Sequence, residues 1–326
     1  MRRRRALLAA ALAAAAALPA RRARAQRAFP ERPVRIVVPY GPGGSSDIVA
    51  RILAQRATEA TGQSFLVENR GGGASIPGTQ AVATAPPDGY TIGTADNALV
   101  VNPALFRERL PYDTERDLTA LGLAVTAPLL LLAHPSAPAR SVAEVLAEAR
   151  ARPGGLAVSH GGIATPTHLA AVQLQLATGL EFNLVGYRGG GPQLTGLVAG
   201  EVPYGLVAIS SAFNHVQAGR LRALAITSQA RSPQLPEVPT MAESGLPAVD
   251  LVGWWGFIAP AGVPPHIVQR LHAVLVAPAR EPAIQARLEG LGYSVVAGSP
   301  EDYAARIRRE IAQWREIVAR VGIRVE

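Results

Sequence analysis

The sequence predicts two α/β domains with a ligand cleft between them. Short apolar strands alternate with helices over short connections, which indicates parallel sheets with right-handed crossovers. This alternation runs twice, and the texture of the chain changes at Pro128–Pro138, between the two series. A chain of 326 residues is also long enough for about two ordinary domains. Clefts between domains are common ligand sites.

The first series begins with a buried strand over Val34–Val38. Ser45 or Ser46 is expected to cap a helix that runs to about Ala60, with Gly62 as its stop signal. The other elements expected in this series are a strand over Phe65–Glu68, a turn at Gly71–Gly73, a helix over Ile76–Ala85 and a strand over Tyr90–Thr94.

The second series begins with a capping box at Ser141–Glu144, which opens a helix that runs to Arg150. The strands expected after it are Leu156–Ser159, Asn183–Tyr187, Val202–Ile209 and Leu224–Thr227, and helices are expected from Pro166, Pro192 and Ser211. The last third should be mostly helical, with helices over His266–Ala277, Pro282–Glu289 and Pro300–Ala319 and strands over Trp254–Ile258 and Tyr293–Val296.

The N-terminus has the layout of a secretory signal. Arg2–Arg5 form a positive segment, Ala6–Leu18 form an apolar segment of 13 residues, and Ala23–Ala25 offers small residues for cleavage before Gln26. The apolar segment is too short to span a bilayer, which takes about 20 residues. We expect a periplasmic protein exported by the Tat or the Sec route. The alternative is an uncleaved amphipathic anchor.

Composition excludes several classes of mechanism. The chain has no cysteine, and all 32 of its basic residues are arginine, so thiolate, P-loop lysine and Schiff-base chemistry are excluded. Seven of these arginines fall in residues 1–25, which leaves 25 arginines against 24 acidic residues, a net charge of +1. A chain so close to neutrality is not a nucleic-acid binder by bulk electrostatics.

Three glycine-rich loops join a strand to a helix, and they are the candidate ligand contacts. They are Tyr40–Asp47, His160–His168 and Tyr187–Pro192. Glycine lets the backbone approach a ligand closely, and the helix start that follows offers free N–H groups to an anion. Each loop can equally be an ordinary connection between a strand and a helix.

Enzyme signatures are missing from the sequence. There is no GxSxG or HExxH motif, and His266 and His272 are six residues apart, which is wrong for a metal pair on one helix face. We therefore expect no catalytic residue, no metal and no cofactor. His168 is expected to pack or to cap a helix, and the alternative is a general base. Trp254 and Trp255 are expected to pack in a hinge or core, and the alternative is an aromatic wall against the ligand.

Several segments together resemble the substrate-binding receptors of tripartite tricarboxylate transporters, the Bug family. The segments that carry the resemblance are Pro33–Asp47, Val67–Arg70, Ala85–Thr91, Val101–Leu105, Leu110–Asp113, Ala218–Ala225, Val238–Thr240 and Phe257–Gly262. Their order and spacing cover essentially the whole chain.

The resemblance implies a type II periplasmic-binding-protein fold that closes on a small carboxylate, an organic acid or acidic amino acid, and serves a membrane transporter as a monomer. Domain 1 would comprise residues 26–127 and 252–326, and domain 2 would comprise residues 128–251. The ligand-binding residues implied by the match are Tyr40, Gly43, Gly44, Ser46, Asp47, Thr94, Asp96, Asn97, His160, Gly161, Gly162, Thr165, Tyr187 and Ser210. Asp47 would orient a water or meet a donor on the ligand.

The chain departs from the family pattern at positions that the resemblance places near the ligand. Pro42, His160, Ala164 and Val207 replace the usual Ala, Ser, Gly and Asp, and Asp96–Ala98 also differs. The resemblance therefore implies no particular ligand. Protonated His160 could donate to a second carboxylate, and neutral His160 could favour a less charged ligand. Two other classes stay open, a sensor partner of a membrane kinase and an exported hydrolase or lyase.

Overall fold

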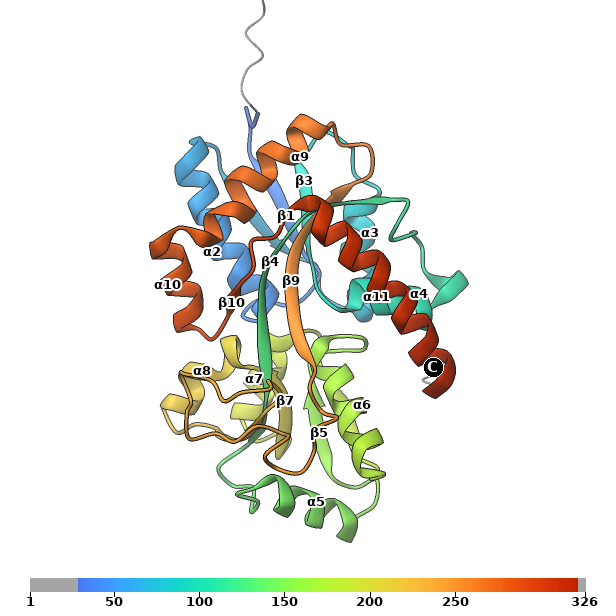
Figure 1. The fold of residues 1–326 in the computed structure, drawn as a ribbon, viewed down its shortest axis with the longest axis vertical. Helices are drawn as coiled ribbons and strands as arrows, with labels where there is room; N and C mark the ends of the chain where they lie inside the picture. The colour runs from blue at the N-terminus through green and yellow to red at the C-terminus, as the bar shows by residue number, and fades with distance from the viewer. Residues whose placement is uncertain (1–28, 322–326) are drawn as a thin grey trace, which may run out of the picture. The chain divides into compact units, whose positions relative to one another are not determined.

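Two sheets share one long strand in the computed structural model, which describes residues 29–321. The shared strand, β4 (Leu118–Ala133), has 16 residues. Its first half pairs with β9 (Val252–Pro260) and β10 (Ser294–Val295), and its second half pairs with β7 (Tyr204–Ala208) and β8 (Arg222–Ile226). Figure 1 shows β4 and β9 running side by side from one sheet toward the other. The signal predicted for residues 1–25 lies outside the described residues.

The first sheet is parallel on one side and antiparallel at its centre. Strand β1 (Val34–Val38) lies between β2 (Phe65–Asn69) and β3 (Thr91–Ala95) and is parallel to both. Strand β9 then pairs antiparallel with both β3 and β4. Four of the five β1 residues are buried, which explains the apolar sequence of this strand.

The second sheet repeats this arrangement. Strand β5 (Ala157–His160) is parallel to β6 (Asn183–Gly186) and to β7, whereas β7 and β8 pair antiparallel with β4. The prediction of parallel sheets is therefore right at the outer strands and wrong at the centre. The reason is that the chain leaves the first sheet on β4 and returns on β9, so these two strands run in opposite directions.

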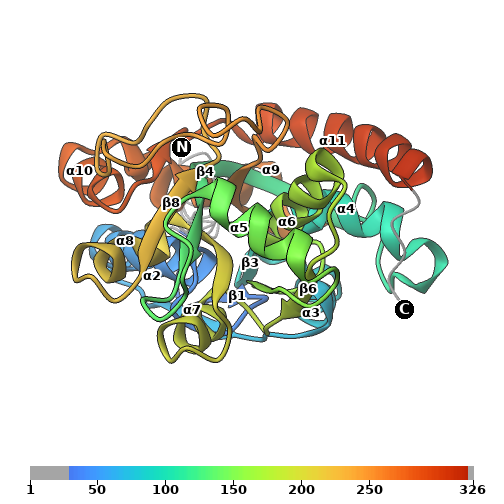
Figure 2. The ribbon, with the colours of Figure 1, turned by 90° about the horizontal axis from the view of Figure 1, so that it is seen from below.

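Helices cover both sheets. Those near the first sheet are α2 (Ser45–Thr61), α3 (Ile76–Ala83), α4 (Ala98–Leu105), α9 (Pro265–Leu271), α10 (Pro282–Gly290) and α11 (Pro300–Val321). Those near the second are α5 (Val142–Ala151), α6 (Pro166–Thr178), α7 (Gly190–Val198) and α8 (Ile209–Gln217). The C-terminal helices α9, α10 and α11 lie along the side opposite α3 and α7 (Figure 2). Within residues 29–321, none of these helices has the length and hydropathy of a membrane span.

The two crossing points implied by the family resemblance are neighbours in the sheet. Ala127 pairs with Gly253, and Pro128 pairs with Val252. Strand β4 continues through Pro128 to Ala133, so the proline-containing stretch is a strand and not a linker. The division into residues 26–127 plus 252–326 and residues 128–251 stays a prediction. Neither β4 nor α4 was expected from the sequence.

Most helix ends follow the local signals in the sequence. The N-cap of α2 is Gly44, with no side-chain hydrogen bond, so the prediction of a Ser45 or Ser46 cap is wrong. Gly62 follows the last residue of α2, as predicted. It has a left-handed φ of 72°, and its N–H donates to the carbonyl of Thr58. The predicted cap of α5 is confirmed, because the Ser141 hydroxyl accepts a hydrogen bond from the N–H of Glu144. Predicted helix His266–Ala277 is α9 followed by a π-helical turn, His272–Val276.

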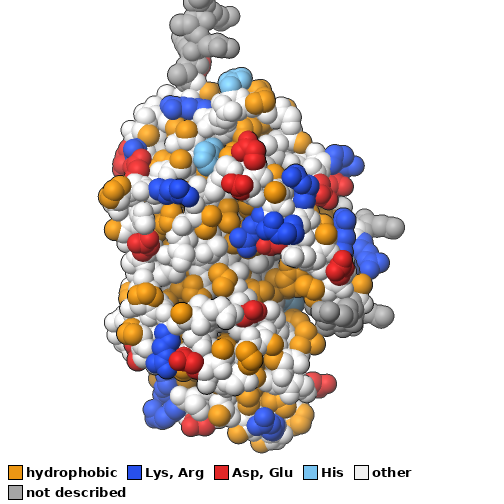
Figure 3. Space-filling model, viewed as in Figure 1, with side chains coloured by type: hydrophobic (Ala, Val, Ile, Leu, Met, Phe, Trp, Pro, Cys, Tyr) orange, Lys and Arg blue, Asp and Glu red, His pale blue; other side chains and the backbone are white. Residues whose placement is uncertain are grey.

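Trp254 joins the C-terminal helix to the central strands. Its side chain is fully buried, as predicted, and its ring meets Tyr303 of α11 edge-on at 5.6 Å between centroids. The indole N–H donates to Oε2 of Glu310 at 3.0 Å. On the face that Figure 3 shows, side chains of both charge signs are interspersed, in keeping with a net charge near zero after residue 25.

Gly256 tests how tightly β9 packs. A Cβ atom at this position would lie 2.6 Å from the Tyr303 ring and 2.8 Å from the carbonyl oxygen of Gly122. We expect Gly256→Ala to lower the free energy of unfolding by about 1–3 kcal/mol, because overpacking forces the core to shift. Gly290→Ala is the control, since nothing lies within 4 Å of its added Cβ. Urea unfolding of both variants checks this, and equal stabilities would contradict it.

Candidate functional site

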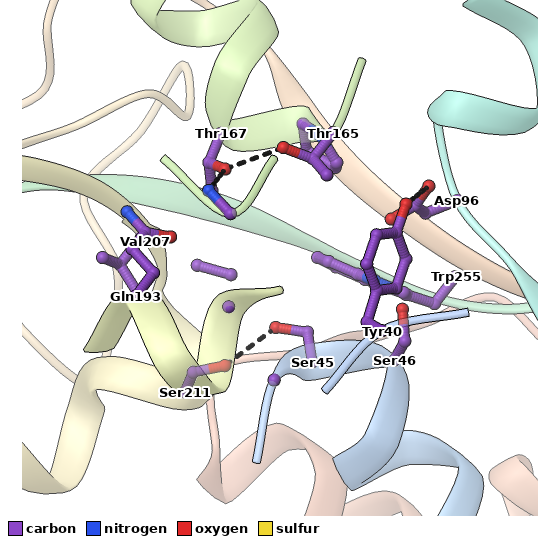
Figure 4. A pocket seen from close by; sticks show the side chains of 15 residues that line it. Tyr40, Ser45, Ser46, Asp96, Thr165, Thr167, Gln193, Val207, Ser211 and Trp255 are labelled. Atoms are coloured by element: carbon purple, nitrogen blue, oxygen red, sulfur yellow. Dashed lines mark hydrogen bonds between the residues drawn. The ribbon is translucent and has the colours of Figure 1, made fainter. Parts of the chain in front are cut away.

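A small cavity lies where elements of the two sheets meet. Its volume is about 40 Å³. The residues that line it are Tyr40, Gly44, Ser45, Ser46, Asp96, Gly161, Thr165, Pro166, Thr167, Gly190, Gln193, Val207, Ala208, Ser211 and Trp255. Figure 4 shows side chains from α2, α6 and α8 turned toward this space. We call it the first cavity.

The first turns of four helices meet at the first cavity. They belong to α2, α6, α7 and α8, which contribute Ser45, Thr167, Gly190 and Ser211 to its lining. N–H groups in the first turn of a helix have no acceptor within their own helix, and the helix dipole adds partial positive charge there. Among the fifteen described residues of the lining, none has a cationic side chain. The cavity therefore offers an anion N–H groups and hydroxyls instead of a cationic side chain, and Asp96 is the one acidic residue of this described lining.

Glycine lets the loops from the two sheets approach each other closely. The N–H of Gly41 donates to the carbonyl of Arg188 at 3.0 Å. A Cβ atom on Gly191 would lie only 1.8 Å from the carbonyl oxygen of Pro42, so only glycine fits there. The Ser45 hydroxyl also lies 2.8 Å from the hydroxyl of Ser210 and 3.1 Å from that of Ser211. These contacts bring the start of α2 against the starts of α7 and α8.

Asp47 stabilises the loop Tyr40–Asp47 through its side chain. Its carboxylate accepts hydrogen bonds from the N–H of Gly43 at 2.9 Å, from the amide of Asn69 at 2.9 Å and from the guanidinium of Arg51 at 2.9 Å. Burial alone would raise the pKa of the Asp47 carboxyl, but these hydrogen bonds outweigh it and lower the pKa below its usual value. The side chain holds Gly43 in its left-handed conformation, φ 85°.

Tyr40 and Asp96 form a buried pair at the other end of the cavity. The Tyr40 hydroxyl donates to Oδ1 of Asp96 at 2.8 Å, and the same oxygen accepts from the N–H of Ala98 at 3.0 Å, which caps α4. Burial raises the pKa of Asp96 to about 7 and also raises the pKa of Tyr40. The Asp96 carboxyl is therefore partly neutral near pH 7.

A second, larger cavity lies beyond Tyr40. Its volume is about 210 Å³. It is lined by Tyr40, Gly72, Gly73, Ala74, Ser75, Gly161, Gly162, Ile163, Gly186, Tyr187 and Arg188. Tyr40 and Gly161 line both cavities, so these two residues lie between them.

A model of the tripartite tricarboxylate transporter receptor family matches residues 49–323. The chain belongs to this family. A protein encoded between tcbD and tcbE in Pseudomonas sp. strain P51 is 39% identical over 298 residues, which are 90% of this chain and 88% of that protein. BugT of Bordetella pertussis is 32% identical over 300 residues, 91% of this chain and 92% of BugT.

Solved structures agree with the family. The periplasmic binding protein BugD superposes with a TM-score of 0.87 at 31% identity, over 91% of this chain and 100% of BugD. An R. palustris protein solved with adipate has a TM-score of 0.86 at 32% identity, covering 91% of this chain and 99% of its own. MatC from Rhodopseudomonas palustris, solved with malate, has a TM-score of 0.84 at 31% identity, and the match covers 89% of this chain and 100% of MatC. The fold is that of periplasmic binding proteins, and the family is one of transporter receptors, not enzymes.

The structure gathers about half of the predicted ligand-binding residues of this receptor around the two cavities. Those that line the first cavity are Tyr40, Gly44, Ser46, Asp96, Gly161 and Thr165. Gly162 and Tyr187 line the second. Those that line neither are Gly43, Asp47, Thr94, Asn97, His160 and Ser210. Within this last group, the side-chain oxygen of Asn97 accepts a hydrogen bond from the N–H of Trp254 at 3.2 Å, so Asn97 contacts strand β9.

His160 lies behind its loop. Its Nδ1 accepts from the N–H of Gly162 at 3.1 Å, and its ring lies 4.7 Å from the ring of His168. Burial lowers the pKa of His160 to about 4 and the pKa of His168 to about 3. Both rings are therefore neutral at pH 7, and the option of a protonated His160 donor to a carboxylate has no support in this environment.

Some residues of the first cavity were not among the ligand-binding residues implied by the match. Those that lie within the predicted glycine-rich loops are Ser45, Pro166, Thr167 and Gly190, and Val207 was named as a departure near the ligand. Trp255 was expected to pack in a hinge or core. Gln193, Ala208 and Ser211 were missed. Gln193 carried no signal, because a polar residue within the first turns of a helix is usually exposed.

Asp96 makes stability depend on pH. Its pKa is about 7 in the folded chain against an ordinary 3.8, so the folded state holds this proton more tightly. The contribution of Asp96 to stability is therefore largest at low pH and is lost as the pH rises from about 4 to about 7. Asp96→Asn keeps a side-chain oxygen that accepts from the Tyr40 hydroxyl and the N–H of Ala98. Because asparagine does not ionise, the variant does not lose this stability as the pH rises.

We expect Asp96→Asn to be more stable than the natural protein at pH 8, by up to about 4 kcal/mol, with the gain shrinking toward pH 4.5. Urea unfolding of both proteins at the two pH values measures the difference. A variant that is destabilised equally at both pH values would contradict the raised pKa.

Proposed function

We propose that this receptor captures a small carboxylate in the periplasm and delivers it to the membrane subunits of a tripartite tricarboxylate transporter. The observation that carries the proposal is the meeting of four helix N-terminal turns at one cavity whose described lining has no cationic side chain. Such a cavity suits one carboxylate group.

The electrostatics favour an anion of low charge. Each helix N-terminus stabilises a nearby negative charge by about 0.3–1 kcal/mol when exposed and by up to about 2 kcal/mol when partly buried. Four such ends acting together, inside the protein, can offset the cost of removing a carboxylate from water. Because these N–H groups are fixed by the backbone, they need no reorganisation on binding.

Relatives support the ligand class. At about 30% identity over nearly their whole length, two solved structures contain the dicarboxylates adipate and malate. The first cavity, with a volume of about 40 Å³, suits a single carboxylate and the atoms next to it, since one water needs about 10–15 Å³ measured in this way. The remainder of a longer acid would pass between Tyr40 and Gly161 into the second cavity.

In this proposal, two domains close around the ligand. The first comprises residues 26–127 plus 252–326, and the second comprises residues 128–251. The hydrogen bonds from Gly41 to Arg188 and from Ser45 to Ser210 and Ser211 would form only in the closed state. A ligand shifts the population toward the closed state to the extent that it binds that state more tightly. The closed surface is then what the membrane subunits recognise.

Ser46→Asp tests the anion site. A carboxylate in the first turn of α2 stabilises the helix but repels a bound anion. Thermal unfolding of Gln26–Glu326 with mono-, di- and tricarboxylates should show stabilisation of the natural protein of about 2.7 kcal/mol at 100 times the dissociation constant. We expect the variant to fold normally and to lose this response.

Ser64→Asp is the matched control, because it adds the same charge on an exposed residue outside both cavities. Its response to ligand should equal that of the natural protein. If Ser46→Asp responds to acids as strongly as the control does, the first turn of α2 does not hold the carboxylate.

Gly191→Ala tests closure. Alanine suits the helical conformation of α7, but its Cβ atom would collide with the carbonyl oxygen of Pro42 across the cavity. We expect the variant to keep its fold, to stay open and to bind the acid at least tenfold more weakly. Small-angle scattering should show ligand-induced compaction of the natural protein and of the control Gly155→Ala, and none of Gly191→Ala. Equal compaction of all three would contradict closure onto this contact.

A further inference from the structure

One acceptor in the first cavity has no donor among the described residues. Gln193, in the second turn of α7, is fully buried, and its Nε2 donates to the carbonyls of Ser159 at 2.9 Å and Leu206 at 2.8 Å. Its Oε1 is buried without a hydrogen-bond partner in the described part of the chain. The position of a Cβ atom on Gly161 would be 3.4 Å from this oxygen, and both residues line the cavity.

The orientation of the Gln193 amide is fixed by chemistry. Both partners on the inner side are carbonyl oxygens, which can only accept, so the NH2 group must face them. The oxygen is then left on the side of the cavity, as Figure 4 shows. An amide oxygen accepts hydrogen bonds and never donates them, so it cannot bind a carboxylate oxygen directly.

A ligand that fits the first cavity therefore carries two different groups close together. The helix N-termini bind a carboxylate, and Gln193 Oε1 accepts a hydrogen bond from a donor group. Gln193 lies on the same short helix whose first turn contributes Gly190 to the lining, so a ligand that meets both has its donor close to its carboxylate. Val207, Ala208 and Trp255 supply the apolar remainder of the wall.

We propose that the receptor selects acids with a hydroxyl or amino group on the carbon next to the carboxylate, and that Gln193 Oε1 accepts from that group. This rests on the proposed function and narrows its ligand class. An acid without the donor leaves a buried acceptor unpaired, which costs enough to weaken binding by about five- to 150-fold. The cost is the basis of the selectivity.

Calorimetry with matched acids tests the proposal on the natural protein, Gln26–Glu326, after unfolding and refolding to remove any bound acid. The pairs are malate against succinate and lactate against propionate, which differ by one hydroxyl. Aspartate against malate distinguishes an amino group from a hydroxyl as the donor. We expect the donor-bearing acid of at least one hydroxyl pair to bind at least tenfold more tightly than its partner.

Gln193→Met removes the amide at similar volume, and Gln217→Met, at the exposed far end of α8, is the matched control. In a folded Gln193→Met variant, the ratio of the two affinities within each pair of acids should fall toward one. The control should keep the ratio of the natural protein. If that variant does not fold, the acid pairs decide by themselves.

Equal affinities within both pairs would overturn the selectivity while leaving carboxylate capture intact. A tenfold preference that survives in folded Gln193→Met would overturn the role of Gln193. Failure of every acid, including tricarboxylates, to bind would overturn the proposed function and this inference with it.

Discussion

The meeting of four helix N-termini at one small cavity is the constraint on which the rest of the structure depends. All four helices follow parallel strands, because α2 follows β1 and the helices α6, α7 and α8 follow β5, β6 and β7. Parallel strands deliver their helix starts to one edge of a sheet. Since both sheets share β4, the two edges face each other, and α7 and α8 begin at the same place. Positive potential arises there from the backbone alone.

A site built from backbone needs side chains that hold its loops and helix starts in place. The carboxylate of Asp47 accepts hydrogen bonds from Gly43, Asn69 and Arg51. The NH2 group of Gln193 donates to two strand carbonyls. Glycine at position 191 lets α7 approach the loop before α2 without a collision. These contacts position the helix starts, and in Gln193 they leave the Oε1 atom without a partner among the described residues.

Much of this was visible in the sequence. Glycine-rich stretches after apolar strands marked the helix starts at Ser45, Pro166 and Gly190 to within two residues, because capping and φ preferences are local. Family resemblance supplied the fold. Local signals could not reveal strand β4, since Pro128 breaks the usual strand pattern and its pairing with Val252 is set by distant contacts.

Side-chain roles within the loops were harder to predict. Asp47 and His160 were expected at the ligand because they occupy matching positions, but neither lines either cavity, and both form hydrogen bonds within their own loops. Gln193 was missed because only the register of β5 and β7 shows that its amide is buried between them. Which atom of a polar residue faces a cavity depends on tertiary partners, and a single sequence does not contain that information.

A crystal structure of residues 26–326 with the acid that stabilises the receptor most would test the central claim directly. The account predicts one carboxylate in the first cavity, with its oxygens within about 3.2 Å of first-turn N–H groups from α2 and from at least one of α6, α7 and α8. A ligand held instead in the second cavity, with its carboxylate on the side chain of Arg188, would contradict it.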